Sequence, residues 1–498
     1  MKPADFAKYD VVITTYQTLA SDYLPPKTAK PASVPRSTGL YSVHWRRIIL
    51  DEGHTIRNPQ SRGAAAVTAV LAKSRWVLTG TPIVNSLKDL FSLVRFIGLT
   101  GGLEKLDVFN SVLVRPLKSG DESATALLQA IMSSLCLRRR KEMKFIDLKL
   151  PKLEEFVSRI AFSDHEQKRY DALYHEAKGE LAAYKNSEGR QAANAYNHLL
   201  EILLRLRQVC NHWQLCAERV NTLMETLQHQ KTVDLTPENR KALQDMLQLS
   251  IESQDECPIC LESLHNPVIT HCAHAFGREC ISRVIETQHK CPMCRSELKG
   301  EEVLVEPAQE FGDQAKDDEL DLNSSSTKLE ALLNILQASR GTGNKTVIFS
   351  QWTRFLDLVQ ARLDREGYKY CRIDGTMSAP LRDQALHSLS DDPSCTIMLA
   401  SLGVCAVGLN LVAANQVVLA DTWWAPAIED QAVDRVHRLG QKKETKVFRL
   451  VMDGSIEDRT LEIQAEKRKL MMMAFQEKSS KRGSGKTARL GDIAKLLK

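Results

Sequence analysis

The chain has 498 residues, of which 43% are hydrophobic and 26% charged, a composition typical of globular proteins. Its length suits about two to four domains, and its net charge of +5 permits a nucleic-acid partner without indicating one. Six of the 12 cysteines lie between Cys257 and Cys294, which favours metal binding over disulfides and so a reducing compartment. We expect no signal peptide, because the N-terminus, Met1-Lys2-Pro3-Ala4 onward, has no apolar core. We expect no membrane partner, because polar residues and glycines interrupt the long apolar stretch 396–420, which predicts strand, loop, strand.

The first chemically suggestive stretch is residues 48–54. Ile48, Ile49 and Leu50 predict a buried strand of a parallel sheet, which places Asp51 and Glu52 at its carboxyl end, where open α/β sheets bind ligands. Paired acids there suit nucleotide hydrolysis, in which one carboxylate holds Mg²⁺ and the next orients the attacking water. The alternative is an ordinary surface pair after a core strand.

Two neighbouring stretches have the same pattern of an apolar run followed by hydroxyl groups. Residues 9–16 predict a buried strand that ends at Thr14 and Thr15, either of which can instead cap the following helix. Residues 76–78 predict a strand that enters the turn Thr79-Gly80-Thr81-Pro82, whose threonines either couple nucleotide state to movement or serve turn geometry alone.

The cysteine cluster has the spacing of a zinc module. Two Cys-x₂-Cys pairs straddle a Cys-x-His pair and a further cysteine, which strongly favours zinc over free thiols. The seven candidate ligands are Cys257, Cys260, Cys272, His274, Cys280, Cys291 and Cys294. By contrast, Cys210 and His212 have no second ligand pair nearby, so we expect them to pack in a core.

From Lys345 onward the pattern alternates strand with helix, which predicts a second parallel sheet. Farther along, four polar residues fall at i, i+3, i+4 and i+7 of a predicted helix and so share one face: Gln431, Asp434, Arg435 and Arg438. Two arginines there suit contact with a γ-phosphate, whereas the alternative is a charged surface with an Asp434–Arg438 ion pair. We expect Trp423 and Trp424 to pack rather than stack on bases.

Residues 51–54, 79–82 and 434–441 resemble the second, third and sixth motifs of superfamily-two helicases, in the order of the Swi/Snf family of DNA translocases. The inserted zinc cluster resembles a RING domain and narrows the resemblance to the helicase-like transcription factor branch. The implied fold class is α/β, with two RecA-like parallel-sheet lobes, the first incomplete, a helical insertion and a small zinc-binding RING-like domain. The expected boundaries are 1–102 for the C-terminal part of the first lobe, 103–250 for the helical insertion, 251–300 for the RING domain, 301–327 for an acidic linker, 328–470 for the second lobe and 471–498 for a basic tail.

The resemblance also implies roles for single residues. ATP and Mg²⁺ would be held by Asp51 and Glu52 from the first lobe and by Gln431, Arg435 and Arg438 from the second. Double-stranded DNA would be contacted by Thr14, Thr15, Gly408 and Asn410, although Val404-Cys405-Ala406 replaces the Ala-Gly-Gly usual before that last pair. The basic cluster 137–141 could contact DNA phosphates, and the alternatives are a solvated helix face or a brace between the lobes.

In a RING domain the first and third ligand pairs share one zinc ion, and the second and fourth share the other. Gly277 stands where the family has its fifth ligand, so one Zn²⁺ site would have only three cysteines. Such a site can add water, use a nearby histidine such as His271, or bind weakly. Ile259, Pro292 and Arg295 match the positions that hold a ubiquitin-conjugating enzyme, and Arg295 would also touch ubiquitin.

One expected part is missing from the sequence. A glycine-rich phosphate-binding loop with Lys-Ser/Thr should precede the acids, but the only Gly-Lys-Thr is Gly485-Lys486-Thr487 in the basic tail. We therefore expect a fragment of a translocase or a degenerate one. The leading hypothesis is an ATP-dependent double-stranded-DNA translocase with RING ubiquitin ligase activity, acting in DNA repair or chromatin in the nucleus, with chromatin or replication-clamp proteins as further partners. The alternatives are a non-motor ubiquitin ligase or DNA-binding adaptor, and a purely structural scaffold.

Overall fold

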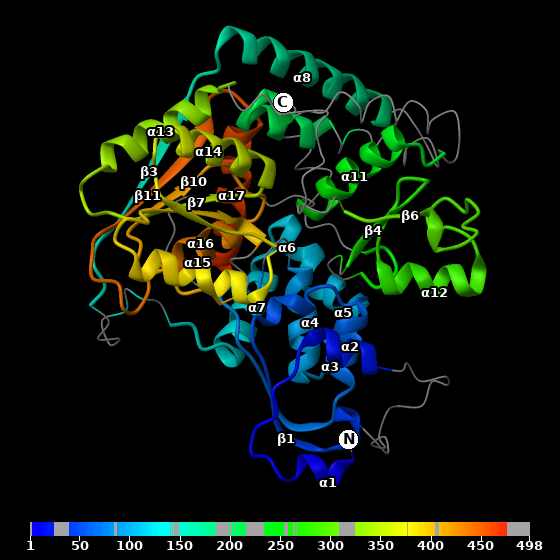
Figure 1. The fold of residues 1–498 in the computed structure, drawn as a ribbon. Coiled ribbons are helices and arrows are strands. Elements are labelled where there is room, and N and C mark those ends of the chain that lie inside the picture. The colour runs from blue at the N-terminus through cyan, green and yellow to red at the C-terminus, as the bar shows by residue number, and fades with distance from the viewer. Residues whose placement is uncertain are drawn as a thin grey trace. The chain divides into compact units, whose positions relative to one another are not determined.

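The computed structural model describes residues 2–23, 39–83, 87–139, 141, 143, 149–185, 199, 202–215, 234–252, 257–261, 264, 266–307, 324–375, 377–403 and 408–475 (Figure 1). The chain divides into two compact units, each with its own sheet and core. The first comprises Met1–Cys136, Glu225–Ala308 and Lys469–Lys486, and the second comprises Leu137–Met224, Gln309–Arg468 and Thr487–Lys498. No described helix is long and apolar enough to cross a membrane.

The first unit contains a two-stranded parallel sheet of β1 (Trp45–Leu50) and β2 (Ala72–Val77). Helix α3 (Arg62–Ala69) connects the strands, and the Ser61 hydroxyl caps it by accepting a hydrogen bond from the Ala64 amide at 3.1 Å. The strands predicted before residues 51–54 and 79–82 are therefore confirmed. One side of the sheet faces a core shared with α3, α2 (Tyr16–Asp22) and α4 (Lys88–Ile97).

The burial predicted for this region is only partly correct. Leu50 is buried, but Ile49 on the opposite face is 55% exposed because no described layer covers that face. Residues 9–15 form no strand, and Ile13 is 91% exposed, so the buried strand predicted at 9–16 is wrong. An apolar run fixes extended backbone only where partner strands and a covering layer exist.

Helices dominate the remainder of the first lobe. A short helix α1 (Pro3–Phe6) begins the unit, and after α4 the chain continues through α5 (Leu106–Phe109), a π-helical turn (Asn110–Val114), α6 (Arg115–Ser119) and α7 (Glu122–Leu135). Their apolar sides form a second core cluster that also includes Leu470 and Ala474 from the end of α17 (Ile456–Ala474). The predicted helical character after residue 103 is confirmed here.

The cysteine-rich region of the first unit is a three-stranded antiparallel sheet with one helix. The strands are β4 (Pro267–Thr270), β5 (Ala275–Gly277) and β6 (Leu304–Val305), in the order β5-β4-β6, and the helix is α12 (Arg278–Gln288). Helix α11 (Pro237–Glu252) precedes them. Because Glu301–Val303 forms a helical turn and β6 pairs with β4, the acidic linker starts later than predicted. Residues 308–323 of that linker lie outside the described residues.

The second unit is built on a six-stranded parallel sheet with the order β3-β11-β10-β7-β9-β8. Its strands are β3 (Leu153–Ile160), β7 (Thr346–Ser350), β8 (Tyr370–Ile373), β9 (Ile397–Ser401), β10 (Gln416–Leu419) and β11 (Thr445–Met452). Helices α13 (Thr327–Ser339), α14 (Thr353–Arg365), α15 (Ala379–Asp391) and α16 (Pro426–Val436) alternate with them. The second parallel sheet and the strand–loop–strand reading of residues 396–420 are confirmed.

One strand of this sheet comes from the segment predicted to be helical. β3 pairs with β11 along its whole length, from Leu153 opposite Thr445 to Ile160 opposite Met452. Helix α8 (Asp164–Lys185) and the helical residues 202–211 follow it and pack on the start of α17. The segment predicted to be mainly helical therefore also contains a strand, β3, whose mixed apolar and charged residues suit a half-exposed edge strand.

Candidate functional site

The acidic turn directly follows β1. Glu52 adopts a left-handed backbone conformation (φ 46°, ψ 50°), which bends the chain sharply after the strand. The Gly53 amide then donates a hydrogen bond to the Leu78 carbonyl at 2.9 Å, and a Cβ at Gly53 would collide with Val77 Cγ1. Only glycine permits this close approach, which leaves the Asp51 side chain exposed and Glu52 half-buried at the carboxyl end of the strand.

His54 joins the acidic turn to the threonine turn after β2. Its Nδ1 lies 3.2 Å from Thr79 Oγ1, 3.4 Å from Thr81 Oγ1 and 3.5 Å from Glu52 Oε2. Burial lowers the pKa of His54, and the Glu52 carboxylate opposes that effect. A neutral imidazole is thus placed where it can exchange partners between a carboxylate and two hydroxyls.

Tyr16 connects the acidic turn to α2. Its hydroxyl donates to the Asp51 carbonyl at 2.7 Å, and burial, followed by the charges of Asp51 and Glu52, raises the pKa of Tyr16. At the preceding residue, Thr15 Oγ1 accepts from the Thr18 amide at 3.1 Å and so caps α2. The helix-cap reading of Thr15 is therefore confirmed, while Thr14 and Thr15 both remain exposed, as a DNA contact requires.

In the second unit, α16 carries Gln431, Asp434 and Arg435 but ends at Val436. Arg438 lies beyond the helix, so the predicted four-residue helix face is wrong at its last member. The helix stops because His437 turns away (φ −91°, ψ 77°) and donates from Nε2 to the Pro151 carbonyl at 2.8 Å.

The predicted Asp434–Arg438 pair is replaced by two other contacts. Asp434 accepts from Lys141 Nζ at 2.5 Å, a contact within the second unit by one residue of the basic cluster. Arg438 Nη1 donates to the Leu409 carbonyl at 3.3 Å, and the Leu411 amide donates to the Arg435 carbonyl at 3.0 Å.

These contacts place both arginines beside the exposed residues Gly408 and Asn410. The second unit therefore brings the predicted phosphate contacts and two of the predicted DNA contacts into one cluster, which we call the arginine cluster. It is formed by Gly408, Leu409, Asn410, Arg435 and Arg438. The acids Asp51 and Glu52 belong to the first unit, so the structure groups the predicted nucleotide residues within each unit.

The zinc ligands form two groups whose donor atoms lie within 4.8 Å of one another. The complete group has four members, Cys272, His274, Cys291 and Cys294. The three-cysteine group consists of Cys257, Cys260 and Cys280. This is the cross-braced pairing that the RING resemblance implies, and the first group offers the four N and S donors of a closed structural zinc site.

His271 does not supply the fourth ligand of the three-cysteine group. Burial lowers the pKa of His271, and the group that opposes this effect is Cys291, a member of the complete group. Among the described residues, no other histidine, cysteine or carboxylate joins the three cysteines. The option of a borrowed His271 is therefore wrong.

The residues predicted to hold a ubiquitin-conjugating enzyme are on the surface. Ile259, Pro292 and Arg295 are exposed, on the two loops that carry Cys257–Cys260 and Cys291–Cys294. Met293 is 55% exposed beside Pro292 and adds an apolar side chain that sequence reasoning missed. Exposed apolar residues with a polar rim typically mark an interaction surface.

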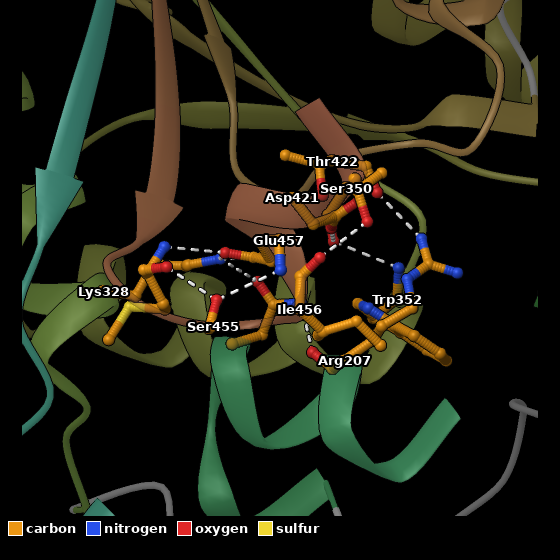
Figure 2. A network of polar contacts seen from close by, with 12 residues as sticks. Arg207, Lys328, Ser350, Trp352, Asp421, Thr422, Ser455, Ile456 and Glu457 are labelled. Carbon is orange, nitrogen blue, oxygen red and sulfur yellow. Dashed lines mark hydrogen bonds and ion pairs between the residues drawn. The ribbon is translucent and has the colours of Figure 1, made fainter. Parts of the chain in front are cut away.

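The second unit also contains a buried polar network that the sequence analysis did not anticipate (Figure 2). Ser350 ends β7 and donates to Asp421, which follows β10, at 2.5 Å. Arg207, from the helical segment 202–211, donates to Gln351 Oε1 and to the Thr422 carbonyl, both at 2.8 Å. The network therefore ties the helical insertion to the carboxyl ends of two central strands.

A buried ion pair extends this network. Lys328 Nζ lies 2.6 Å from Glu457 Oε1 and 3.2 Å from Asn211 Oδ1, and both charged side chains are almost fully buried. The Arg207 guanidinium also lies within 6 Å of the ring centroids of Trp352, Trp423 and Trp424. The tryptophans and Cys210 therefore pack, as predicted. The available signal was a cluster of polar residues, 207–212, at the end of an apolar helix.

Three protein-family models and several curated proteins match this chain. A model of the SNF2-related domain matches residues 1–215, the helicase conserved C-terminal domain matches 327–440, and the C3HC4-type RING finger matches 256–294. The chain is 38% identical over 510 residues to helicase-like transcription factor of Homo sapiens, covering 100% of this chain and 49% of that protein. It is 36% identical over 489 residues to DNA repair protein RAD5A of Arabidopsis thaliana, covering 94% of this chain and 46% of that protein. The chain thus spans about half the length of the curated relatives it matches.

Proposed function

We propose that this chain, which matches the SNF2-related, helicase C-terminal and RING finger models, is an ATP-dependent double-stranded-DNA translocase with ubiquitin ligase activity, acting in DNA repair or chromatin. The observation that supports the motor is that His54 Nδ1 contacts both Glu52 and Thr79 at the end of a parallel strand. The nuclear location and a partnership with chromatin or replication-clamp proteins are parts of the same proposal.

The residues of the acidic turn and of the arginine cluster fit a Mg²⁺–nucleotide complex. Carboxylate oxygens of Asp51 and Glu52 are the donors that Mg²⁺ prefers, and the guanidinium groups of Arg435 and Arg438 suit phosphate oxygens, with Gln431 as an added polar contact. The bound metal would neutralise charge on the phosphates. The protein's own part is to orient the attacking water at Glu52, with His54 relaying the state of that carboxylate to Thr79 and Thr81.

DNA would be held mainly through its backbone. Thr14 and Thr15 in the first unit and Gly408 and Asn410 in the second are exposed hydroxyl, amide and main-chain groups, which position a phosphate backbone without reading sequence. This suits a motor that must move along any duplex.

The ligase activity would use the exposed loops of the RING domain. Zinc fixes these loops, and Ile259, Pro292 and Arg295 hold the conjugating enzyme, with Arg295 also contacting its ubiquitin. Catalysis then consists of orientation, because the reacting bond belongs to the bound enzyme and not to this chain.

Phosphate release from ATP, with and without duplex DNA, tests the motor. We expect Glu52→Gln and Arg435→Ala/Arg438→Ala to abolish DNA-stimulated release, the arginine pair by roughly 10³–10⁵-fold. Arg159→Ala, on an exposed surface ion pair of the second unit, should leave release unchanged. Release that is insensitive to both active-site variants would contradict the assigned roles.

A second candidate function, that of a non-motor ubiquitin ligase, is favoured by the exposure of Ile259, Pro292 and Arg295 on the two zinc-binding loops. The sequence Gly485-Lys486-Thr487 in the basic tail lies outside the described residues. Ubiquitin discharge from a charged conjugating enzyme should fall at least tenfold in Ile259→Ala, by roughly the loss of one apolar anchor. Leu135→Ala is the matched control, because Leu135 is an apolar residue outside the zinc region with nearly the same exposure, 37% against 36% for Ile259. Ligase activity without any ATP turnover would replace the motor proposal by this one.

A further inference from the structure

The two zinc groups of the RING domain differ in one position, residue 277. Gly277 ends β5 and precedes α12, and its amide donates to Cys257 Sγ at 3.4 Å. A side chain at this position would therefore begin beside the three-cysteine group. The complete group has four protein donors, whereas the three-cysteine group has three among the described residues.

We propose that Cys257, Cys260 and Cys280 hold a second Zn²⁺ through three thiolates and leave its fourth coordination position open to an exchangeable ligand, either water or a small thiol. Zinc prefers tetrahedral coordination, and a position without a protein ligand is the mark of sites that exchange ligands rather than of closed structural sites. The three-cysteine site would then exchange ligands, whereas the complete group in the same RING domain would be a closed structural site.

Electrostatics does not prevent such a site. Zn²⁺ with three thiolates has a net charge of −1, and the complete group with three cysteines and one histidine would have the same net charge. The three-cysteine group also has favourable dipoles, because the Gly277 amide points at Cys257 and Cys280 lies in the first turn of α12, where the helix dipole favours negative charge. The three-cysteine group therefore lacks a fourth protein ligand, but its negative charge is stabilised by its surroundings.

The backbone at Gly277 allows the decisive variant. Its φ of −69° and ψ of 133° are ordinary for any L-residue, so Gly277→Cys introduces a fourth thiolate without backbone strain. Gly179→Cys is a matched control, since Gly179 in α8 has no atom within 4 Å of an added Cβ and adds a thiol far from either group in sequence.

The test is the zinc content of the full chain and the rate at which a colorimetric chelator removes each ion. We expect the native chain to bind two zinc ions, one of which leaves at least about tenfold faster, since even a lost outer-sphere partner weakens metal binding by about 10–100-fold. Gly277→Cys should make both ions slow, and Gly179→Cys should behave like the native chain. Cys280→Ser should remove only the fast ion.

Two results would overturn the proposal: two equally slow ions in the native chain, or a single ion even in excess zinc. Substitution by Co²⁺ identifies the fourth ligand. A rise in sulfur-to-cobalt charge-transfer absorption on adding 2-mercaptoethanol to the native chain assigns a thiol, and an unchanged spectrum, distinct from that of Gly277→Cys, assigns water. A native spectrum identical to that of Gly277→Cys would contradict an open position.

An open coordination position on the second zinc ion would also affect the proposed ligase activity. This consequence is the one part of the inference that rests on the proposed function. Ile259 lies between Cys257 and Cys260, so the labile ion shapes the loop that would contact the conjugating enzyme. Ubiquitin discharge by the native chain should then depend on free zinc, while discharge by Gly277→Cys should not. The zinc-release measurement stands independently, so a chain without ligase activity leaves it interpretable.

Discussion

The two parallel sheets of this protein begin from similar apolar runs and end in different environments. In the second unit all residues of β7, β9 and β10 are buried. In the first unit Ile49 and Trp76 lie opposite each other in β1 and β2 and are 55% and 54% exposed. Similar apolar runs thus form parallel strands in both units, but their burial depends on neighbouring strands and covering helices that lie elsewhere in the chain.

The difference also appears in how polar groups are used. At the exposed sheet, the side chains of Glu52 and His54 stay partly accessible to solvent. At the covered sheet, Ser350 and Asp421 at the strand ends are buried near Arg207. Arg207 bonds to the Thr422 carbonyl and so holds the helical insertion on the sheet. The strand ends of one unit therefore carry solvent-accessible polar groups, whereas those of the other bury their polar groups in a network that holds the insertion.

The largest effect should follow from breaking the buried ion pair of the covered sheet. Lys328→Met leaves the Glu457 carboxylate without its cation, which costs about 3–5 kcal/mol for a buried pair. Hydrogen–deuterium exchange of peptides from β7 and β9 would report this loss for the second unit alone. The double variant Lys328→Met/Glu457→Met should regain most of the loss, and failure to do so would show that the pair does more than compensate charge.

Truncation in the core of the covered sheet comes next. Ile348 in β7 is fully buried, so Ile348→Ala should lower the free energy of unfolding of the second unit by about 2–5 kcal/mol, through lost burial and the cavity left behind. The same exchange measurement applies. A loss well below 1 kcal/mol would mean that this sheet is less tightly packed than its burial indicates.

Much of this architecture was predictable from local patterns. The alternation of strand with helix after Lys345 followed from short apolar runs, which are a local property, and the cross-braced grouping of the cysteines followed from the resemblance to a RING domain. The acidic turn and the threonine turn were each visible in the sequence. Their connection through His54 was not, because it depends on how two strands align.

The failures have a common cause. β3 was missed because its residues alternate weakly and gain a partner strand from almost 300 residues away. Arg438 was placed on a helix that stops early because His437 finds a carbonyl outside that helix. Arg207 and Lys328 were missed because a buried charge is recognised only when its distant partner is known.

A pH-dependent effect of intermediate size should come from Asp421. Burial raises the pKa of Asp421 to about 6, and the Ser350 hydroxyl opposes that rise. The native state therefore holds this proton to a higher pH than the unfolded chain does. Its contribution to stability is full below about pH 4 and is lost as the pH rises through about 6.

Asp421→Asn removes this titration. The stability of the native chain relative to Asp421→Asn should fall by on the order of 2 kcal/mol between pH 4.5 and pH 7, measured by urea unfolding of the second unit. Asp392→Asn is an informative control, because hydrogen bonds from Ser394 lower the pKa of Asp392 and its contribution therefore changes in the opposite direction with pH. A pH-independent difference at Asp421 would mean that Arg207 and Lys328 keep the carboxylate ionised.

The smallest effect should be found on the exposed sheet of the first unit. Ile49→Thr removes apolar surface from a face where Trp76 has the Arg47 guanidinium 5.8 Å from its ring centroid as a partial cover. Because this side chain gives up little burial, the free energy of unfolding of the first unit should change by no more than about 0.5 kcal/mol, while binding of a hydrophobic dye should decrease. The contrast with Ile348→Ala, a change in the same residue type, isolates burial as the cause. A loss of more than about 2 kcal/mol in the free energy of unfolding for Ile49→Thr would mean that this face is covered in solution. Both sheets would then be covered, and they would differ only in what covers them.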